Sequence, residues 1–291
     1  AIRGLEEDMR LKIRELLENV EGKSEFNFVT EIAEQLPLWV LCEMMGIPES
    51  DRSKIRDLVN NLTDASIQQD PNNSFQIWVN YMELFKMGRD MIEERRKKPT
   101  DDLMSVVANT KVEGGDLPPE LLDGFFLLMV IAGNETTRNT LTGGLMALTE
   151  NPSEREKLLK DPSLIANATD EMLRWVTSVI YFRRTATKDT NIRGQDIKAG
   201  DKIIMWYGSA NRDEDIFIDG HLFKVDRQNA KKHLAFGAGE HLCLGNRLGH
   251  MQIRILFEEL LKRFPNIHSV AEPVRIPSNF LAGISELKVS I

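Results

Sequence analysis

The sequence predicts a mainly α-helical protein with a small β region, an α+β fold. Apolar residues recur at helical spacing through most of the 291 residues, and one such pattern runs unbroken from Pro119 to Glu150. Strand-like alternation marks residues 181–187 and 196–207, and residues 270–291 indicate turns and short strands. With 42% apolar residues the chain can bury a large core, and we expect a single domain over residues 1–291.

The first predicted helices are amphipathic. From Leu5 to Leu17 the apolar residues form one stripe, which predicts a surface helix. The pattern from Phe28 to Met45 stops at Gly46, a residue typical of a helix C-terminus. Ser50 and Asp51 follow, and we expect them to cap the next helix.

The longest predicted helix, Pro119 to Glu150, covers about 32 residues and about 48 Å. Residues 125–131 are apolar nearly all round, so we expect this half of the helix to be buried. Residues 132–137 at its centre read Ala-Gly-Asn-Glu-Thr-Thr. Glycine weakens a helix and threonine competes for its carbonyls, which indicates either a functional site or a kink with a satisfied polar patch.

A glycine-rich loop from Phe236 to Gly245 delivers one cysteine, Cys243, to the start of another predicted helix. Glycines let the backbone approach a large flat ligand, and we expect that ligand to be a haem. The partial positive charge of a helix N-terminus favours thiolate, the form that ligates iron, so we expect a thiolate here. The alternative is a structural cysteine after a glycine-rich turn.

The run Phe236-Gly-x-Gly-x-His241-x-Cys243-x-Gly245 resembles the haem-binding signature of the cytochrome P450 family, in its soluble bacterial form. The resemblance implies the cytochrome P450 fold, with the long central helix over the haem and Cys243 as ligand of the iron of haem b. It also implies that the cofactor is surrounded by Phe236, Gly237, Gly239, His241 and Gly245.

The resemblance extends to the centre of the long helix, which is similar to the family's oxygen-groove motif. It implies that Thr136 donates a hydrogen bond to dioxygen at the iron and that Glu135 relays protons. Ala132 and Gly133 would then lie against the cofactor.

A Glu-x-x-Arg pair, Glu171 and Arg174, follows the oxygen motif in the chain. On spacing alone such a pair decorates many solvent-exposed helix faces. The resemblance implies instead a structural triad under the haem, completed by Arg227, with bidentate ion pairs.

Arg184 and His241 lie where the family places partners of the haem propionates; Arg183 faces the opposite side because strand residues alternate. By resemblance the substrate pocket is lined by mostly apolar residues, each of which is equally well interpreted as core. These apolar walls favour a lipophilic substrate such as a sterol, a terpenoid or a fatty acyl chain. The expected lining residues are Phe125, Met129, Val176, Val179, Ile180 and Phe280.

Composition narrows the function classes further. With 37 Lys and Arg against 45 Asp and Glu, the net charge of −8 argues against non-specific binding to nucleic acid. Two cysteines, Cys42 and Cys243, predict a cytoplasmic protein without disulfides, and no apolar run approaches the ~20 residues of a membrane span. A zinc site at Cys243 is excluded because too few Cys and His accompany it.

The resemblance therefore implies a monooxygenase that hydroxylates a lipophilic small molecule with O2. Its electrons would come from NAD(P)H through a ferredoxin-type partner. The alternative is a haem-binding protein or fragment that does not turn over, or a peroxygenase driven by peroxide. The family's chain normally starts well before Ala1, so we expect its N-terminal portion, including the first helix and strands, to be missing here.

Overall fold

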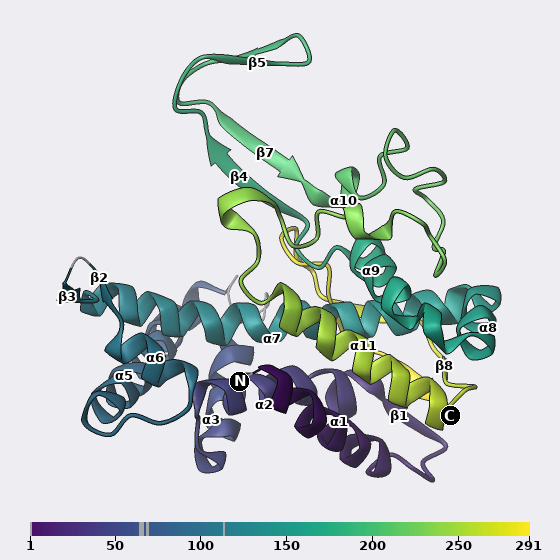
Figure 1. Ribbon diagram of the computed structural model, residues 1–291, viewed down its shortest axis with the longest axis horizontal. Helices are drawn as coiled ribbons and strands as arrows, with labels where there is room; N and C mark the ends of the chain where they lie inside the picture. Colours follow the sequence, from purple (N-terminus) through teal and green to yellow (C-terminus); the bar gives the residue numbers. More distant parts are fainter. Residues whose placement is uncertain (1, 64–66, 68–69, 113) are drawn as a thin grey trace.

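The computed structural model describes residues 2–63, 67, 70–112 and 114–291, and it confirms the mainly α fold with a small β region. The long helix α7 (Pro119–Glu150) runs across the molecule, as Figure 1 shows. Helices α2 (Gln35–Met45), α9 (Ile165–Val176) and α11 (Asn246–Arg263) pack against it. The other α-helices are α1 (Ile2–Glu18), α3 (Glu49–Thr63), α5 (Ser74–Lys97), α6 (Leu103–Asn109), α8 (Pro152–Lys160) and α10 (Tyr207–Ala210).

The bounds of α7 agree with the prediction. Pro119 occupies the first turn, where its missing N–H is not needed, and Pro152 begins α8 directly after Asn151. In the second half of α7, two glycines allow neighbouring helices to approach closely. A Cβ at Gly143 would lie 2.7 Å from Val176, and one at Gly144 would lie 3.1 Å from Phe257.

The first half of α7 differs from the prediction that it is buried all round. Phe126 and Val130 are buried, but Leu121 and Leu128 are 60% and 62% exposed. Helices α2 and α5 pack on the side of this half that carries Phe126 and Gly133. An apolar run shows that a surface avoids water, but it does not show whether protein or a ligand covers each side.

The remaining helices follow local signals with one exception. The apolar stripe of α1 is buried, and α1 packs against α11. Gly46 ends α2 with φ +71°, as its position predicts. The predicted cap is wrong, because α3 begins at Glu49 and takes Ser50 and Asp51 into its first turn.

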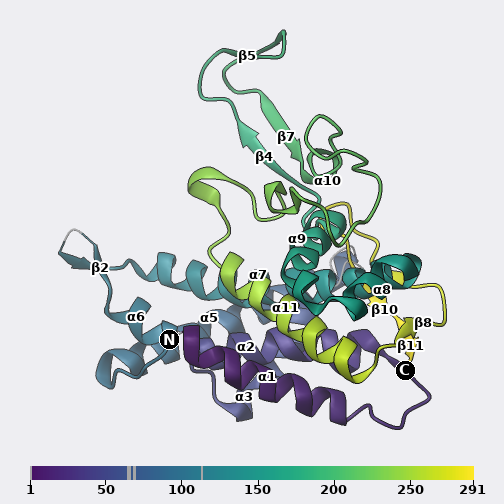
Figure 2. The same ribbon diagram turned by 45° about the vertical axis from the view of Figure 1, so that its right-hand side comes forward.

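The predicted β region is a hairpin that stands away from the helical body in both views (Figures 1 and 2). Strand β4 (Tyr181–Thr185) pairs antiparallel with β7 (Lys202–Trp206), and β5 (Thr190–Ile192) with β6 (Gln195–Ile197) forms the tip. The described part of the chain holds three further antiparallel groups. They are β1 (Glu25–Asn27) with β11 (Lys288–Ser290) and β8 (His268–Ser269), β9 (Val274–Arg275) with β10 (Ile284–Glu286), and β2 (Lys111–Val112) with β3 (Gly115–Asp116).

Among the described residues, no helix combines the length and the apolar character that crossing a membrane requires.

Candidate active site

The loop that carries Cys243 is closed by its own hydrogen bonds. Gly237 and Gly239 have φ of +70° and +68°, which favours glycine at both positions. The Cys243 N–H donates to the carbonyl of Phe236 at 2.9 Å, and the side-chain amide of Asn246 donates to the carbonyl of Cys243 at 2.7 Å. These bonds hold the sulfur at a defined place, three residues before α11.

Cys243 is a free, exposed cysteine. Protein atoms near its sulfur shield the thiolate from water and raise its pKa, while a hydrogen bond from the Gly245 N–H opposes the rise. The predicted stabilisation of the thiolate is therefore wrong for the protein alone, because the burial of the sulfur outweighs the hydrogen bond from the Gly245 N–H. In the protein alone the thiol is favoured, and a metal cation at the sulfur would deprotonate it.

The loop lies next to the centre of α7. A Cβ at Gly249, on α11, would lie 3.8 Å from the ring of Phe236 and 4.0 Å from Oγ1 of Thr137. In Figures 1 and 2 the segment around residue 240 lies between the β4–β7 hairpin and α7. The two segments that the sequence singled out thus meet in space.

Thr136 uses its hydroxyl within the helix. The O–H donates to the carbonyl of Ala132 at 2.9 Å, while the carbonyl of Thr136 accepts from the hydroxyls of Thr140 and Ser178, both at 2.9 Å. Ala132 itself is exposed. The lone pairs of the Thr136 hydroxyl remain available to a ligand, but donating its hydrogen requires breaking the bond to Ala132.

Polar groups beside Thr136 keep unused hydrogen-bonding capacity. Glu135 is buried and forms an ion pair with Arg138 at 2.6 Å. Both amide atoms of Asn134 and Nε of Arg138 are buried without a partner among the described residues. The alternative of a satisfied polar patch is therefore wrong, and such atoms call for water or a ligand.

Gly133 does not face the same way as Ala132. A Cβ at Gly133 would lie 3.3 Å from Leu41 of α2, so this glycine faces the place where α2 crosses α7. A side chain at this position would point toward α2, and the prediction that the Gly133 backbone lies against a cofactor stays a prediction. Residues next to each other on a helix point about 100° apart, which the motif alone does not show.

The three residues of the predicted triad contact one another in the structure. Arg174 donates to both oxygens of Glu171 at 2.7 Å, and Nε of Arg227 donates to the same oxygens at 3.1 and 3.0 Å. Glu171 and Arg174 are completely buried. The remaining N–H groups of the two arginines donate to the carbonyls of Asn211, Ile218, Asp219, Gly220 and Leu222.

Arg183 and Arg184 line two different cavities. Arg184 lines a cavity of about 360 Å³ together with His241 and Gly237 of the cysteine loop. Arg183 lines a second cavity, of about 400 Å³. This agrees with the alternation of facing directions along a strand.

Three of the predicted pocket residues lie together. Val179 forms a β-bridge with Leu281, and the N–H of Ile180 donates to the carbonyl of Phe280 at 2.9 Å. Phe125 and Met129 are half-buried on the less covered half of α7. Val176 packs directly on Gly143, so of its two interpretations the structure favours the core.

The sequence analysis missed a cluster that joins the triad to the loop. The carboxylate of Asp170, next to Glu171 on α9, lies 3.7 Å from His233 and 3.4 Å from His250. Burial alone would raise the pKa of Asp170, but the two histidines outweigh it and lower the pKa to about 2. The ring of His233 contacts that of Phe236 in the loop. The only signal was that these histidines flank the loop.

Comparisons with known proteins agree with this geometry. A model of the cytochrome P450 family matches residues 49–289. Steroid C26-monooxygenase of Rhodococcus jostii is 36% identical, with 99% of this chain and 60% of that protein covered. Methyl-branched lipid omega-hydroxylase of Mycobacterium bovis is 38% identical, with 91% of this chain and 62% of that protein covered.

A solved Mycobacterium marinum cytochrome P450 in complex with pseudoionone is 35% identical. It superposes with a TM-score of 0.93 over 100% of this chain and 71% of its own. The chain therefore belongs to the cytochrome P450 family, a family of haem-containing oxidoreductases. It spans about 60% of the length of the two curated relatives above.

The residues present fit a haem. Cys243 offers a free sulfur, and the leucines on either side of it, Leu242 and Leu244, are 52% and 79% exposed. Apolar side chains left uncovered beside a free thiol suit an apolar, flat cofactor. Arg184 and His241, in one cavity, suit its carboxylates.

Proposed function

We propose that this chain is a haem-thiolate monooxygenase that hydroxylates a lipophilic small molecule with O2. We further propose that its electrons come from NAD(P)H through a ferredoxin-type partner. The observation that carries the proposal is that the loop of the exposed Cys243 meets the polar centre of α7, where Phe236 of the loop and Thr137 of α7 both lie beside Gly249. When bound, the haem supplies the activation of oxygen and its insertion into a C–H bond.

In this proposal the chain's own residues hold the cofactor and deliver protons to the site. Cys243 ligates the iron, and Arg184 and His241 hold the propionates. The Thr136 hydroxyl, now bonded to the Ala132 carbonyl, accepts one hydrogen bond and releases its own hydrogen toward the site. Glu135, held by Arg138, is the acid nearest to Thr136 in the chain and would relay a proton taken up from water to Thr136.

The substrate class follows from the walls of the site and from the relatives. Val179, Ile180 and Phe280 form an apolar wall, with Phe125 and Met129 contributing from α7. The names of the two curated relatives specify a steroid and a methyl-branched lipid. We propose a sterol, a terpenoid or a fatty acyl chain.

The test is to load the protein with haem, reduce it and add carbon monoxide. A thiolate-type Soret band, together with NADH-dependent hydroxylated product when a ferredoxin and its reductase are added, supports the proposal. The band without any NADH-dependent product indicates a haem-binding protein that does not turn over. Product formed only with hydrogen peroxide indicates a peroxygenase.

Thr136→Ala provides a sharper test of the proton path. The variant should incorporate haem normally, while a larger share of the electrons from NADH ends as hydrogen peroxide because a proton donor is lost. Thr142→Ala is the matched control, since the Thr142 hydroxyl bonds the carbonyl of Arg138 at 2.8 Å in the same way but is fully buried. Equal peroxide yields from the two variants would remove Thr136 from the mechanism.

A further inference from the structure

Arg183 is a cation without a counter-ion. Among residues 2–63, 67, 70–112 and 114–291, its guanidinium has neither a hydrogen-bond acceptor nor an ion-pair partner, although its carbonyl accepts from Arg184 at 3.0 Å. Most other arginines near the site are paired: Arg174 and Arg227 with Glu171, and Arg138 with Glu135. A guanidinium offers five donors in a fork that matches a carboxylate.

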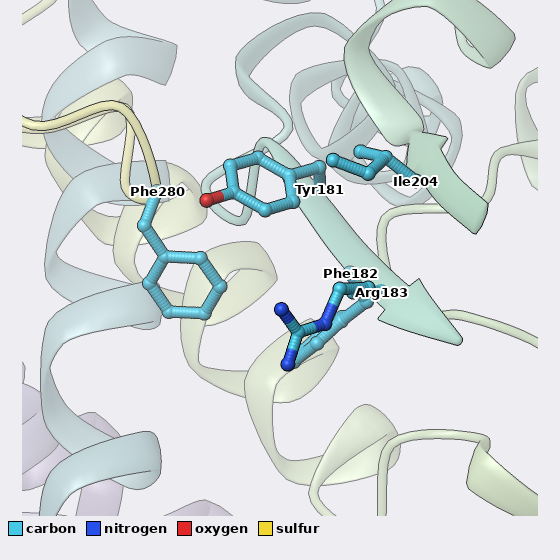
Figure 3. A pocket seen from close by; sticks show the side chains of 5 residues that line it. All are labelled: Tyr181, Phe182, Arg183, Ile204 and Phe280. Atoms are coloured by element: carbon cyan, nitrogen blue, oxygen red, sulfur yellow. The ribbon is translucent and has the colours of Figure 1, made fainter. Parts of the chain in front are cut away.

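The cavity beside Arg183 is aromatic. It measures about 400 Å³ and is lined by Tyr181, Phe182, Ile204 and Phe280 in addition to the arginine. The ring of Phe280 packs edge-on against Tyr181 and Phe182, at centroid distances of 5.9 and 5.6 Å. In Figure 3 the guanidinium extends from β4 toward the space beside Phe280. A cavity of this size and lining suits an apolar ligand with one anionic group.

The charge of the surrounding strands also favours an anion. Strands β4 and β7 carry Arg183, Arg184 and Lys202, and neither strand contains an acid. Lys202 donates to the hydroxyl of Thr185, and Arg184 faces the other cavity. In a chain of net charge −8, this hairpin base is locally positive, and Arg183 is its free member.

We propose that Arg183 binds the carboxylate of a lipophilic acid, while Tyr181, Phe182 and Phe280 cover the first part of its chain. The inference rests on the proposed function and specifies its substrate: a long-chain carboxylic acid, or a larger lipid ending in a carboxylate. Phe280 also belongs to the apolar wall with Val179 and Ile180. The acid is thus anchored at one end, and its apolar end is left for oxidation.

The experiment uses the haem-loaded protein and a matched pair of probes, dodecanoic acid and methyl dodecanoate, titrated by the spin-state change of the iron. We expect the acid to bind about tenfold more tightly than the ester, since a charge-assisted hydrogen bond contributes about 1.5 kcal/mol at a partly exposed site. Arg183→Gln should abolish this preference by weakening only the acid, and Arg183→Lys should keep part of it.

Arg193→Gln is the control, because it removes an equally exposed cation from the same hairpin, at the tip. It should leave the preference unchanged. Equal binding of acid and ester by the unaltered protein, or an unchanged preference in Arg183→Gln, overturns the inference. So does a loss of haem in Arg183→Gln, which would show that the arginine serves a propionate instead.

Failure of the proposed function gives a different result. If acid and ester both bind as expected but no NADH-dependent product forms, the carboxylate site stands and the monooxygenase proposal does not. If oxygenated products form from neutral lipids while acids show no advantage, the monooxygenase proposal stands and the carboxylate site does not.

Discussion

Two buried polar regions of this molecule differ in how completely they are bonded. Around Glu171, both carboxylate oxygens accept from Arg174 and Arg227, and the N–H groups of Arg174 all donate to Glu171 or to a backbone carbonyl. Around Asn134, on α7, buried amide atoms and Nε of Arg138 lack a partner among the described residues. A satisfied network fixes the structure, whereas unsatisfied polar atoms at the centre of α7 leave bonding capacity for a ligand.

We expect the largest effect from a substitution of the proposed iron ligand. Cys243→Ser should abolish the thiolate-type Soret band of the reduced, carbon monoxide-bound protein, because a hydroxyl does not replace a thiolate as iron ligand. The free energy of unfolding of the haem-free protein should hardly change, since Cys243 is exposed and its backbone carries the loop's hydrogen bonds.

Cys42→Ala is the matched control for that change. Cys42 is fully buried in α2, and burial raises the pKa of its thiol to about 11, so it is a small apolar side chain and not a ligand. The variant should keep the thiolate band. A normal band in Cys243→Ser, or its loss in Cys42→Ala, would contradict the assignment of the iron ligand.

A substitution in the triad, unlike one at Cys243, should change the free energy of unfolding. Arg174→Met removes both bonds to Glu171 and three bonds to backbone carbonyls, leaving buried oxygens unpaired. Urea unfolding should show a loss of about 3–5 kcal/mol, the usual effect of breaking a buried ion pair. Lys160→Met, which breaks an exposed pair with Glu156, should have no measurable effect. Equal stabilities of the two variants would mean that the triad does not hold the fold.

This contrast also explains what the sequence could reveal. The ends of α7 were predictable because Pro119 and Pro152 act locally. The triad was not predictable from local patterns. Its third member, Arg227, lies 56 residues from Glu171, and only the family resemblance connected them. The Asp170 cluster joins three distant segments and left no local pattern at all.

The prediction of a thiolate at Cys243 failed for a physical reason. It considered the helix N-terminus but not the burial of the sulfur, which raises the pKa of the thiol more than the Gly245 N–H lowers it. The contact of Gly133 with Leu41 of α2 was likewise not visible in the sequence. Electrostatic and steric effects at this range depend on positions of one turn or less, which spacing in a sequence does not supply.

Replacing a glycine by alanine should have smaller and opposite effects on stability in the two halves of α7. Gly143→Ala places a Cβ 2.7 Å from Val176 in the tightly packed half, and overpacking of this kind costs about 1–3 kcal/mol of unfolding free energy. Gly124→Ala, in the less covered half, meets no atom within 4 Å and should stabilise by up to about 1 kcal/mol through helix propensity. Thermal unfolding measures both. Changes of the same sign would show that the halves are equally packed.

The smallest effect should come from Asp170, where scaffold and site touch. Its pKa is lowered to about 2, so its pairing with His233 and His250 stabilises the fold above pH 4 and is lost as the pH falls toward 2. Asp170→Asn should therefore reduce the unfolding free energy by about 1–2 kcal/mol at pH 5 and by less at pH 3. His250→Gln, which removes one of the two partners, should give about half the loss at pH 5. A loss that is independent of pH would mean that Asp170 acts through packing and not through its charge.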